Sequence, residues 1–137
     1  MIIDAKNLII GRLASYAAKQ ALLGETIEII NIEQSIITGS KQDVIGKQHQ
    51  RLARGHVYKG PFTERNEENF FKRLVRGMLP YKQERGKLAW KRIKCHIGIP
   101  AHLKDKKAET VAEASLARTN TLKYIKLADV ARLMGGR

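Results

Sequence analysis

Hydrophobic residues in the first forty positions follow two different periods. Residues 2–4 form a short apolar strand, and the apolar positions between Gly11 and Leu23 repeat at the spacing of one helical face. Residues 26–32 (TIEIINI) alternate and are rich in β-branched side chains, which is typical of a strand. The order strand, helix, strand predicts the start of a βαβ unit.

Three further helices are predicted between residues 40 and 93. A short apolar run at 36–39 comes before a helix from Ser40 to Arg54, with Ser40 as its N-cap. The next helix, 66–79, has the clearest helical period, and its apolar positions are Phe70, Phe71, Leu74, Val75, Met78 and Leu79. Pro80 ends that helix, and another is expected over 84–93, with Leu88, Ala89 and Ile93 facing inward.

The last third of the chain is less regular. Residues 95–99 (CHIGI) are predicted to form a buried strand, and 101–120 an irregular segment that is weakly helical near 108–114. A last strand at 124–127 and a short helix at 129–134 complete the pattern. Alternating strands and helices favour an α/β fold with a mainly parallel sheet, and a length of 137 residues suits one domain spanning 1–137.

Charge is concentrated in the middle of the chain. The formal net charge is +13, and residues 41–94 hold fifteen basic side chains against five acidic ones. The densest stretch, Lys72 to Lys94, has nine lysines and arginines in 23 residues and one acid, Glu84. A solvated surface usually mixes charges of both signs, so this segment predicts a polyanionic partner, of which a nucleic acid is the commonest.

The residues expected to meet that partner fall into two basic stripes and a loop. Positively charged side chains would neutralise phosphates, and glycines would let a backbone approach closely. The candidate RNA-binding residues are Lys47, Arg51, Arg54, Lys59, Arg73, Arg76, Gly77, Lys82, Arg85, Gly86, Lys87, Lys91 and Arg92. Tyr81 and Trp90 could stack on unpaired bases, although core packing is favoured for Trp90.

The chain carries no catalytic, metal or cofactor motif. Its four histidines lack the spacing of a metal site, and it has no glycine-rich dinucleotide fingerprint, phosphate loop or nucleophile elbow. Asp4 and Glu33, at predicted strand ends, are interpreted as capping or salt-bridging groups and not as a catalytic pair. We therefore expect no enzyme activity, metal, cofactor or small-molecule substrate. An RNA-processing enzyme that holds its substrate on the basic face is the alternative.

The compartment follows from the absence of export features. The chain has one cysteine, Cys95, no apolar run of membrane-spanning length and no secretory pattern at residues 1–12. These features predict a cytoplasmic protein without a membrane partner.

One block of residues in the basic segment is highly specific: Arg76-Gly77-Met78-Leu79-Pro80, followed by Lys82 and Arg85-Gly86. Further short motifs, in chain order, are Asp4-Ala5, Gly11 to Ser15, Asn31-x-Glu33, Thr38-Gly39, Gly60-Pro61 with Arg65, and Gly98-Ile99-Pro100. Together these motifs resemble the universal large-subunit ribosomal protein family L-thirteen, in particular its archaeal branch.

This resemblance implies a three-layer α/β/α fold around a four-stranded, mainly parallel sheet. It also implies a structural constituent of the cytoplasmic large ribosomal subunit. Such a protein would bind 23S-type ribosomal RNA through segment 41–94, contact neighbouring large-subunit proteins and support early subunit assembly.

Overall fold

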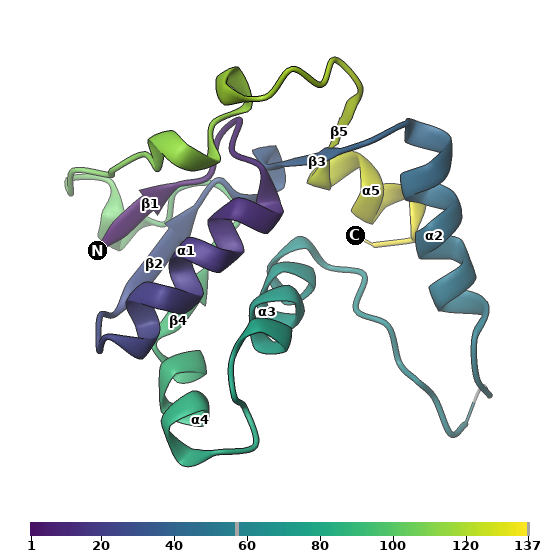
Figure 1. Cartoon of the computed structure of the whole chain (residues 1–137), viewed down its shortest axis with the longest axis horizontal. Coiled ribbons are helices and arrows are strands. Elements are labelled where there is room, and N and C mark those ends of the chain that lie inside the picture. The colour runs from purple at the N-terminus through teal and green to yellow at the C-terminus, as the bar shows by residue number, and fades with distance from the viewer. Residues whose placement is uncertain (57, 137) are drawn as a thin grey trace.

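The computed structural model describes residues 1–56 and 58–136. Within these ranges the fold is α/β, with three parallel strands in one sheet and a separate antiparallel pair (Figure 1). The strands are β1 (Ile2–Asp4), β2 (Ile27–Ile30), β3 (Ile36–Thr38), β4 (Ile93–Cys95) and β5 (Tyr124–Lys126). The helices are α1 (Ile10–Leu22), α2 (Lys41–Ala53), α3 (Glu67–Met78), α4 (Glu84–Lys91) and α5 (Leu127–Leu133). None of these helices is both long and apolar enough to cross a membrane.

The parallel sheet has the strand order β1-β2-β4. In its register Ile3 lies opposite Ile29, and Ile29 lies opposite Cys95. β3 pairs with β5 instead, in an antiparallel ladder. The expectation of one four-stranded sheet is therefore wrong for the described residues, because β3 takes its partner from the C-terminal end of the chain.

Helices α1, α3 and α4 cover one face of the parallel sheet. Leu13, Ala14 and Ala17 of α1 are completely buried, and their small or branched side chains let the helix lie close to the strands. Phe71 and Val75 of α3 are also fully buried in this core. Burying a side chain as large as Phe71 contributes about 1.5–3 kcal/mol to stability.

The opposite face of the sheet carries alternating polar residues, including Glu28 and Lys94. It is approached by the 3₁₀ turn η2 (Ala101–Leu103), whose His102 lies beside Glu28. The expected third layer of helices is thus replaced here by a single turn and the irregular chain that follows it. The core of the domain lies on the helical side.

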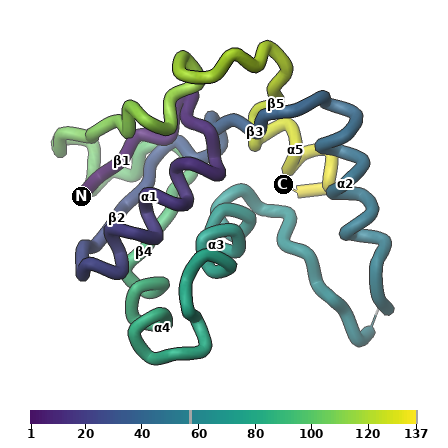
Figure 2. The backbone as a smooth tube through the Cα atoms, viewed as in Figure 1, coloured from purple at the N-terminus to yellow at the C-terminus, as the bar shows by residue number. Residues whose placement is uncertain are grey.

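A second, smaller apolar cluster attaches α2 to the C-terminal end of the chain. Val44 of α2 packs with Ile125 of β5 and with Val130 and Met134 near α5. The tube drawing shows α2 and the chain after it extending away from the parallel sheet, on the other side of α3 from α1 (Figure 2). Ser40 caps α2 as predicted, its hydroxyl accepting a hydrogen bond from the Asp43 N–H at 3.2 Å.

The strand predicted at 95–99 begins earlier, at Ile93, and ends at Cys95. Ile97 and Ile99 are about half exposed, at 52% and 48%. After the strand the chain turns at Gly98, which adopts a positive φ of 65° and whose N–H donates to the Glu33 carboxylate at 3.1 Å. The early start of β4 also shortens α4.

The predicted helix near 108–114 is reduced to a 3₁₀ turn, η3 (Ala112–Ala114), inside an otherwise irregular segment. Two other single turns, η2 and η4 (Leu116–Arg118), interrupt the same segment. The irregular character expected for 101–120 is therefore confirmed, and the weak helical pattern within it is not.

Candidate nucleic-acid interface

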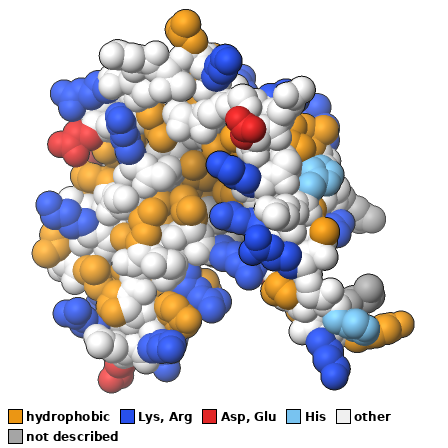
Figure 3. Space-filling model, turned by 45° about the vertical axis from the view of Figure 1, so that its right-hand side comes forward, with side chains coloured by type: hydrophobic (Ala, Val, Ile, Leu, Met, Phe, Trp, Pro, Cys, Tyr) orange, Lys and Arg blue, Asp and Glu red, His pale blue; other side chains and the backbone are white. Residues whose placement is uncertain are grey.

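A series of hollows follows the surface between α2, the loop 54–66, α3 and α4. The first, of about 420 Å³, separates α2 from α3. Its basic lining comes from Arg51, Arg54 and Arg73, and Gly77 lies at its α3 side. Lysine and arginine side chains gather around a hollowed region on this side of the molecule (Figure 3).

Two further hollows continue the surface toward α4. Arg73 also lines the second, of about 360 Å³, together with Lys72, Arg76 and Trp90. Arg76 in turn lines the third, smaller one, with Tyr81, Lys87 and Trp90. Arg73 lines the first and second hollows and Arg76 the second and third, so the three lie in a row along this surface, which we call the basic groove.

The amphipathic character of α3 places these two arginines. Phe71 and Val75 are buried against the sheet, whereas Arg73 and Arg76 are exposed on the other face, one helical turn apart. The sequence of α3 therefore determines both which of its side chains enter the core and which line the middle of the groove.

The loop 54–66 forms the outer wall of the groove. It closes on itself through paired backbone hydrogen bonds between His56 and Gly60, at 3.0 and 2.9 Å. The Arg73 guanidinium donates from Nη1 to the Phe62 carbonyl at 2.8 Å and so ties this loop to α3. At the loop tip Tyr58 is 86% exposed, and Lys59 is exposed beside it.

Tyr81 and Trp90 lie at the α4 end of the groove. The guanidinium carbon of Arg76 is 4.6 Å from the centre of the Tyr81 ring, which is a cation–π contact. The Trp90 indole N–H donates to the Lys72 carbonyl at 3.4 Å, and the side chain remains 38% exposed. Core packing of Trp90 is therefore wrong as a prediction, because the small residues Gly86 and Ala89 occupy the buried face of α4.

Among the residues that the structure describes, no carboxylate forms an ion pair with a groove arginine. Over the described ranges, the two acid–base contacts within 4.0 Å both involve Glu28, which lies on the opposite face of the sheet. One carboxylate, Glu64, lines the first two hollows, and it accepts a hydrogen bond from the Asn69 amide at 3.4 Å. The groove arginines are thus available for an external anion.

Comparison with known sequences decides the family. A family model described as ribosomal protein L13 matches residues 1–102, a range that includes the whole groove. The chain belongs to the ribosomal protein L13 family.

Similarity to individual L13-family proteins extends over almost the whole chain. The chain is 41% identical over 137 residues to the large ribosomal subunit protein uL13 of Methanosarcina barkeri, covering 99% of this chain and 98% of the relative. It is 43% identical over 136 residues to the uL13 of Methanopyrus kandleri, with 98% and 86% covered. For the uL13 of Haloarcula marismortui, identity is 35% over 135 residues, with 98% and 90% covered.

In this L13-family chain, the predicted residues divide into three groups. The groove contains Arg51, Arg54, Arg73, Arg76, Gly77 and Lys87. Exposed positions that do not line its three hollows are occupied by Lys47, Lys59, Lys82, Arg85 and Lys91. The remaining two, Gly86 and Arg92, make internal contacts.

Gly86 and Arg92 serve the packing of the L13-family fold. Gly86 is buried, and a Cβ at this position would lie 2.1 Å from the Pro80 carbonyl oxygen. Its lack of a side chain is therefore required by the protein's own backbone, and the expectation that it admits RNA is corrected. Arg92 is half-buried, and its Nη1 donates to the Ala21 carbonyl at 3.2 Å, which ties the end of α4 to α1.

Sequence reasoning missed three groove or loop residues. Lys72 lines the second hollow although it lies on the half-buried side of α3, and Phe62 and Tyr58 are largely exposed in the loop. The available signal was a large aromatic side chain, Tyr58, between Gly55 and Gly60, with a second, Phe62, shortly after Gly60.

Asp4 and Glu33 cap turns, as one of the two predicted roles requires, and neither forms an ion pair in the part of the chain that the structure describes. Asp4 accepts a hydrogen bond from the Asn31 side-chain amide at 3.0 Å, and Glu33 accepts from the Gly98 N–H at 3.1 Å. Each carboxylate therefore fastens a turn beyond the end of a strand.

The thiol of Cys95 is expected to be unreactive. Burial of Cys95 raises its pKa to about 12, a shift that Lys72 opposes and Glu68 reinforces. Because the nucleophilic form is the thiolate, a thiol with this pKa stays protonated and unreactive at neutral pH.

Proposed function

We propose that this chain is a structural constituent of the large ribosomal subunit, located in the cytoplasm with that particle. Its basic groove binds 23S-type ribosomal RNA. The curated relatives are named as large ribosomal subunit proteins, and the chain covers nearly their full length. The observation that carries the RNA-binding part is the row of hollows lined by Arg51, Arg73 and Arg76, which form no ion pair with a carboxylate among the residues that the structure describes.

The chemistry of the groove suits the phosphate backbone of folded RNA. Arginine side chains offer planar, forked donors that bridge two phosphate oxygens or two neighbouring phosphates. The major groove of A-form RNA is closed to side chains, so recognition depends on RNA shape and on backbone contacts. Exposed Tyr58 and Phe62 supply flat surfaces for bases that are not paired.

Segment 41–94 acts in this proposal as the RNA-binding part of a single domain. α2 and the loop form one wall of the groove, while α3 and α4 form its floor and far end. Segments of RNA that converge here are held together by positive charge from both walls. This arrangement supports a role in early subunit assembly, with neighbouring large-subunit proteins as further contacts.

The enzyme alternative finds little support in the groove. Among the described residues, its first two hollows share one carboxylate, Glu64, and neither is lined by histidine, while His56 lines the adjoining hollow beside Arg54 and Phe62. General acid–base cleavage of RNA needs two groups that exchange protons with the reacting atoms. Binding without turnover is the function that these side chains support.

Sedimentation with the ribosome tests the proposal. We expect the full chain to remain with the large subunit after a high-salt wash, and the double variant Arg76→Glu/Arg85→Glu to be released. Lys107→Glu/Lys104→Glu makes the same charge change on exposed positions of the irregular segment and is expected to stay bound. Retention of the Arg76→Glu/Arg85→Glu protein, with its circular dichroism unchanged, contradicts the proposed interface.

A further inference from the structure

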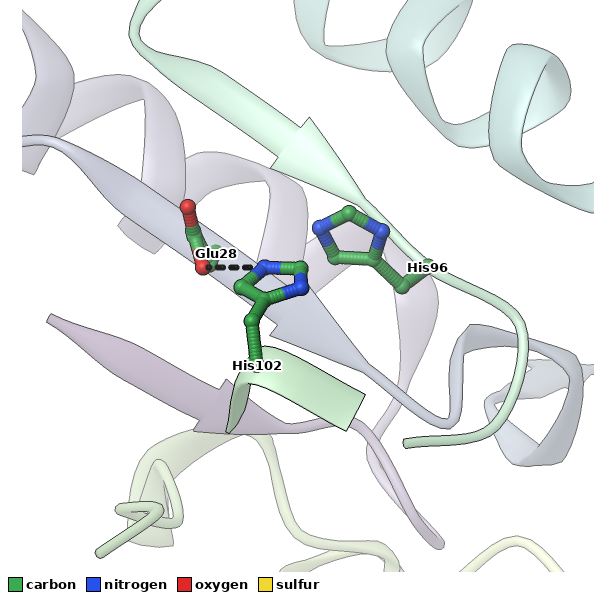
Figure 4. Close-up of side chains that lie close together, drawn as sticks. All are labelled: Glu28, His96 and His102. Atoms are coloured by element: carbon green, nitrogen blue, oxygen red, sulfur yellow. Dashed lines mark ion pairs between the residues drawn. The ribbon is translucent and has the colours of Figure 1, made fainter. Parts of the chain in front are cut away.

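Three side chains distant in sequence converge on the face of the sheet opposite the α-helical layer. Glu28 lies on β2, His96 follows β4, and His102 lies on η2 (Figure 4). Glu28 is paired in register with Lys94, and alternation along the strand brings His96 to the same face two residues later. The fold therefore assembles this cluster from two parallel strands and the turn that crosses them.

The geometry of the cluster is close to that of a coordination site. Single ligand atoms from Glu28, His96 and His102 all lie within 4.8 Å of one another. His102 Nε2 is 3.6 Å from a Glu28 carboxylate oxygen, and the two imidazole rings are 5.6 Å apart at 80°. For comparison, zinc bonds of about 2.0–2.1 Å in a tetrahedron place neighbouring ligand atoms roughly 3.3 Å apart.

The His96 ring supplies an independent observation. Its Nε2 atom is buried and has no hydrogen-bond partner in the part of the chain that the structure describes. That edge of the ring faces His102 and Glu28 (Figure 4). A buried polar atom left unpaired destabilises the fold, so a ligand at this position would relieve that cost.

We propose that Glu28, His96 and His102 bind a divalent transition-metal ion, with Zn²⁺ as the preferred ion. Two imidazole nitrogens and one carboxylate oxygen suit zinc, whereas Mg²⁺ and Ca²⁺ prefer oxygen ligands throughout. Three protein ligands leave the fourth tetrahedral position to water. The His102 side chain is 58% exposed, so it has room for the shift of about an ångström that would close the site.

Two neighbouring residues limit the site. Lys94 Nζ lies 3.8 Å from the other Glu28 carboxylate oxygen, and its positive charge competes with the ion. Cys95 is not a ligand, because its side chain is buried in the core on the opposite side of the sheet. The bound ion joins η2 to β2 and β4 and thereby fastens the start of the irregular segment to the sheet.

Spacing along the chain could not reveal this site. His96 and His102 are six residues apart, and Glu28 lies far upstream, so no linear zinc motif is present. The site depends on strand pairing, and it is separate from the proposed RNA interface.

Zinc titration of the metal-stripped full chain tests the proposal. Calorimetry with ZnCl₂ is expected to show one ion per chain, and Co²⁺ is expected to give the visible absorption of a tetrahedral site. In nitrogen-detected histidine spectra, the His96 Nε2 and His102 Nε2 signals should shift on addition of zinc. Absence of stoichiometric binding, or zinc-dependent shifts confined to His49 and His56, overturns the proposal.

Variants identify the ligands. Glu28→Gln and His102→Gln should each weaken zinc binding by at least about tenfold. Replacing even a residue that only hydrogen-bonds to a metal ligand lowers metal affinity by about that factor. His49→Gln, an exposed histidine on α2, is the matched control and should bind zinc unchanged. Lys94→Gln keeps all three ligands and should bind zinc more tightly; weaker or unaltered binding in that variant contradicts the assigned geometry.

Discussion

The Arg76 guanidinium lies over the face of the Tyr81 ring, with 4.6 Å between the guanidinium carbon and the ring centre. Arg76 is on the last turn of α3, and Tyr81 follows Pro80 in the turn that leads to α4. The ring thus orients an arginine that lines two hollows of the groove. The sequence explains this contact, because Pro80 ends α3 and the chain then turns so that the Tyr81 ring lies against Arg76.

Replacement of Tyr81 tests whether this orientation matters for RNA binding. A cation–π contact at an exposed site is worth about 0.5–1 kcal/mol. Tyr81→Leu should therefore weaken RNA binding by roughly two- to fivefold, measured by filter binding at fixed salt. Tyr81→Phe keeps the aromatic face and should bind like the wild type. Equal losses in both variants would show that the hydroxyl, not the ring face, is responsible.

Two glycines of the Lys72–Lys94 segment are expected to respond oppositely to alanine. A Cβ at Gly86 would lie 2.1 Å from the Pro80 carbonyl oxygen, so Gly86→Ala should lower the free energy of unfolding by about 1–3 kcal/mol. A Cβ at Gly77 would meet nothing within 4 Å, and alanine stabilises a helix by up to about 1 kcal/mol relative to glycine. Gly77→Ala should therefore raise the free energy of unfolding. Urea denaturation measures both, and a stable Gly86→Ala protein would contradict the packing role.

Arg92 and Lys91 are adjacent basic residues with different expected roles. Arg92→Met removes the hydrogen bond to the Ala21 carbonyl and should cost about 1–2 kcal/mol of stability. Lys91→Met changes an exposed side chain and should leave the unfolding free energy within about 0.5 kcal/mol of wild type. If urea denaturation gives the two variants equal stability, the tie between α4 and α1 is not important for the fold.

The Cys95 thiol makes the free energy of unfolding depend on pH in the alkaline range. Its pKa is raised from 9.0 to about 12 in the folded protein, because the buried thiolate is poorly solvated. Above pH 9.0 the unfolded chain releases this proton while the folded chain retains it, so stability falls with rising pH up to about 12. The stability difference between wild type and Cys95→Ala should shrink as the pH rises through 9.0. A pH-independent difference would place the thiol in contact with solvent.

Helices were predictable from sequence where one periodic face is buried. The apolar positions of α1 and α3 repeat along a single side, and Ser40 offers an oxygen at the start of α2. The sheet was less predictable, because each strand is only three or four residues long. A segment that short has too few alternating positions to reveal its partner, so the pairing of β3 with β5 could not be foreseen.

The basic surface was predictable as a set of residues and not as a shape. Charge density identified segment 41–94, yet only tertiary contacts place Arg51 of α2 opposite Arg73 of α3 across one hollow. Glycines are similarly ambiguous in sequence. Gly77 and Gly86 both lie in basic helices, and only the structure shows that the Pro80 carbonyl lies against Gly86 and not against Gly77.

The salt dependence of binding to 23S-type ribosomal RNA tests the central claim most directly. Log affinity should fall steeply and linearly with log salt, because each neutralised phosphate releases a counterion. Arg51→Gln/Arg76→Gln should reduce that slope by about 2, one for each phosphate that the variant no longer neutralises, whereas Lys104→Gln/Lys107→Gln should leave it unchanged. A flat salt response, or an unaltered slope in Arg51→Gln/Arg76→Gln, would contradict RNA binding by the basic groove.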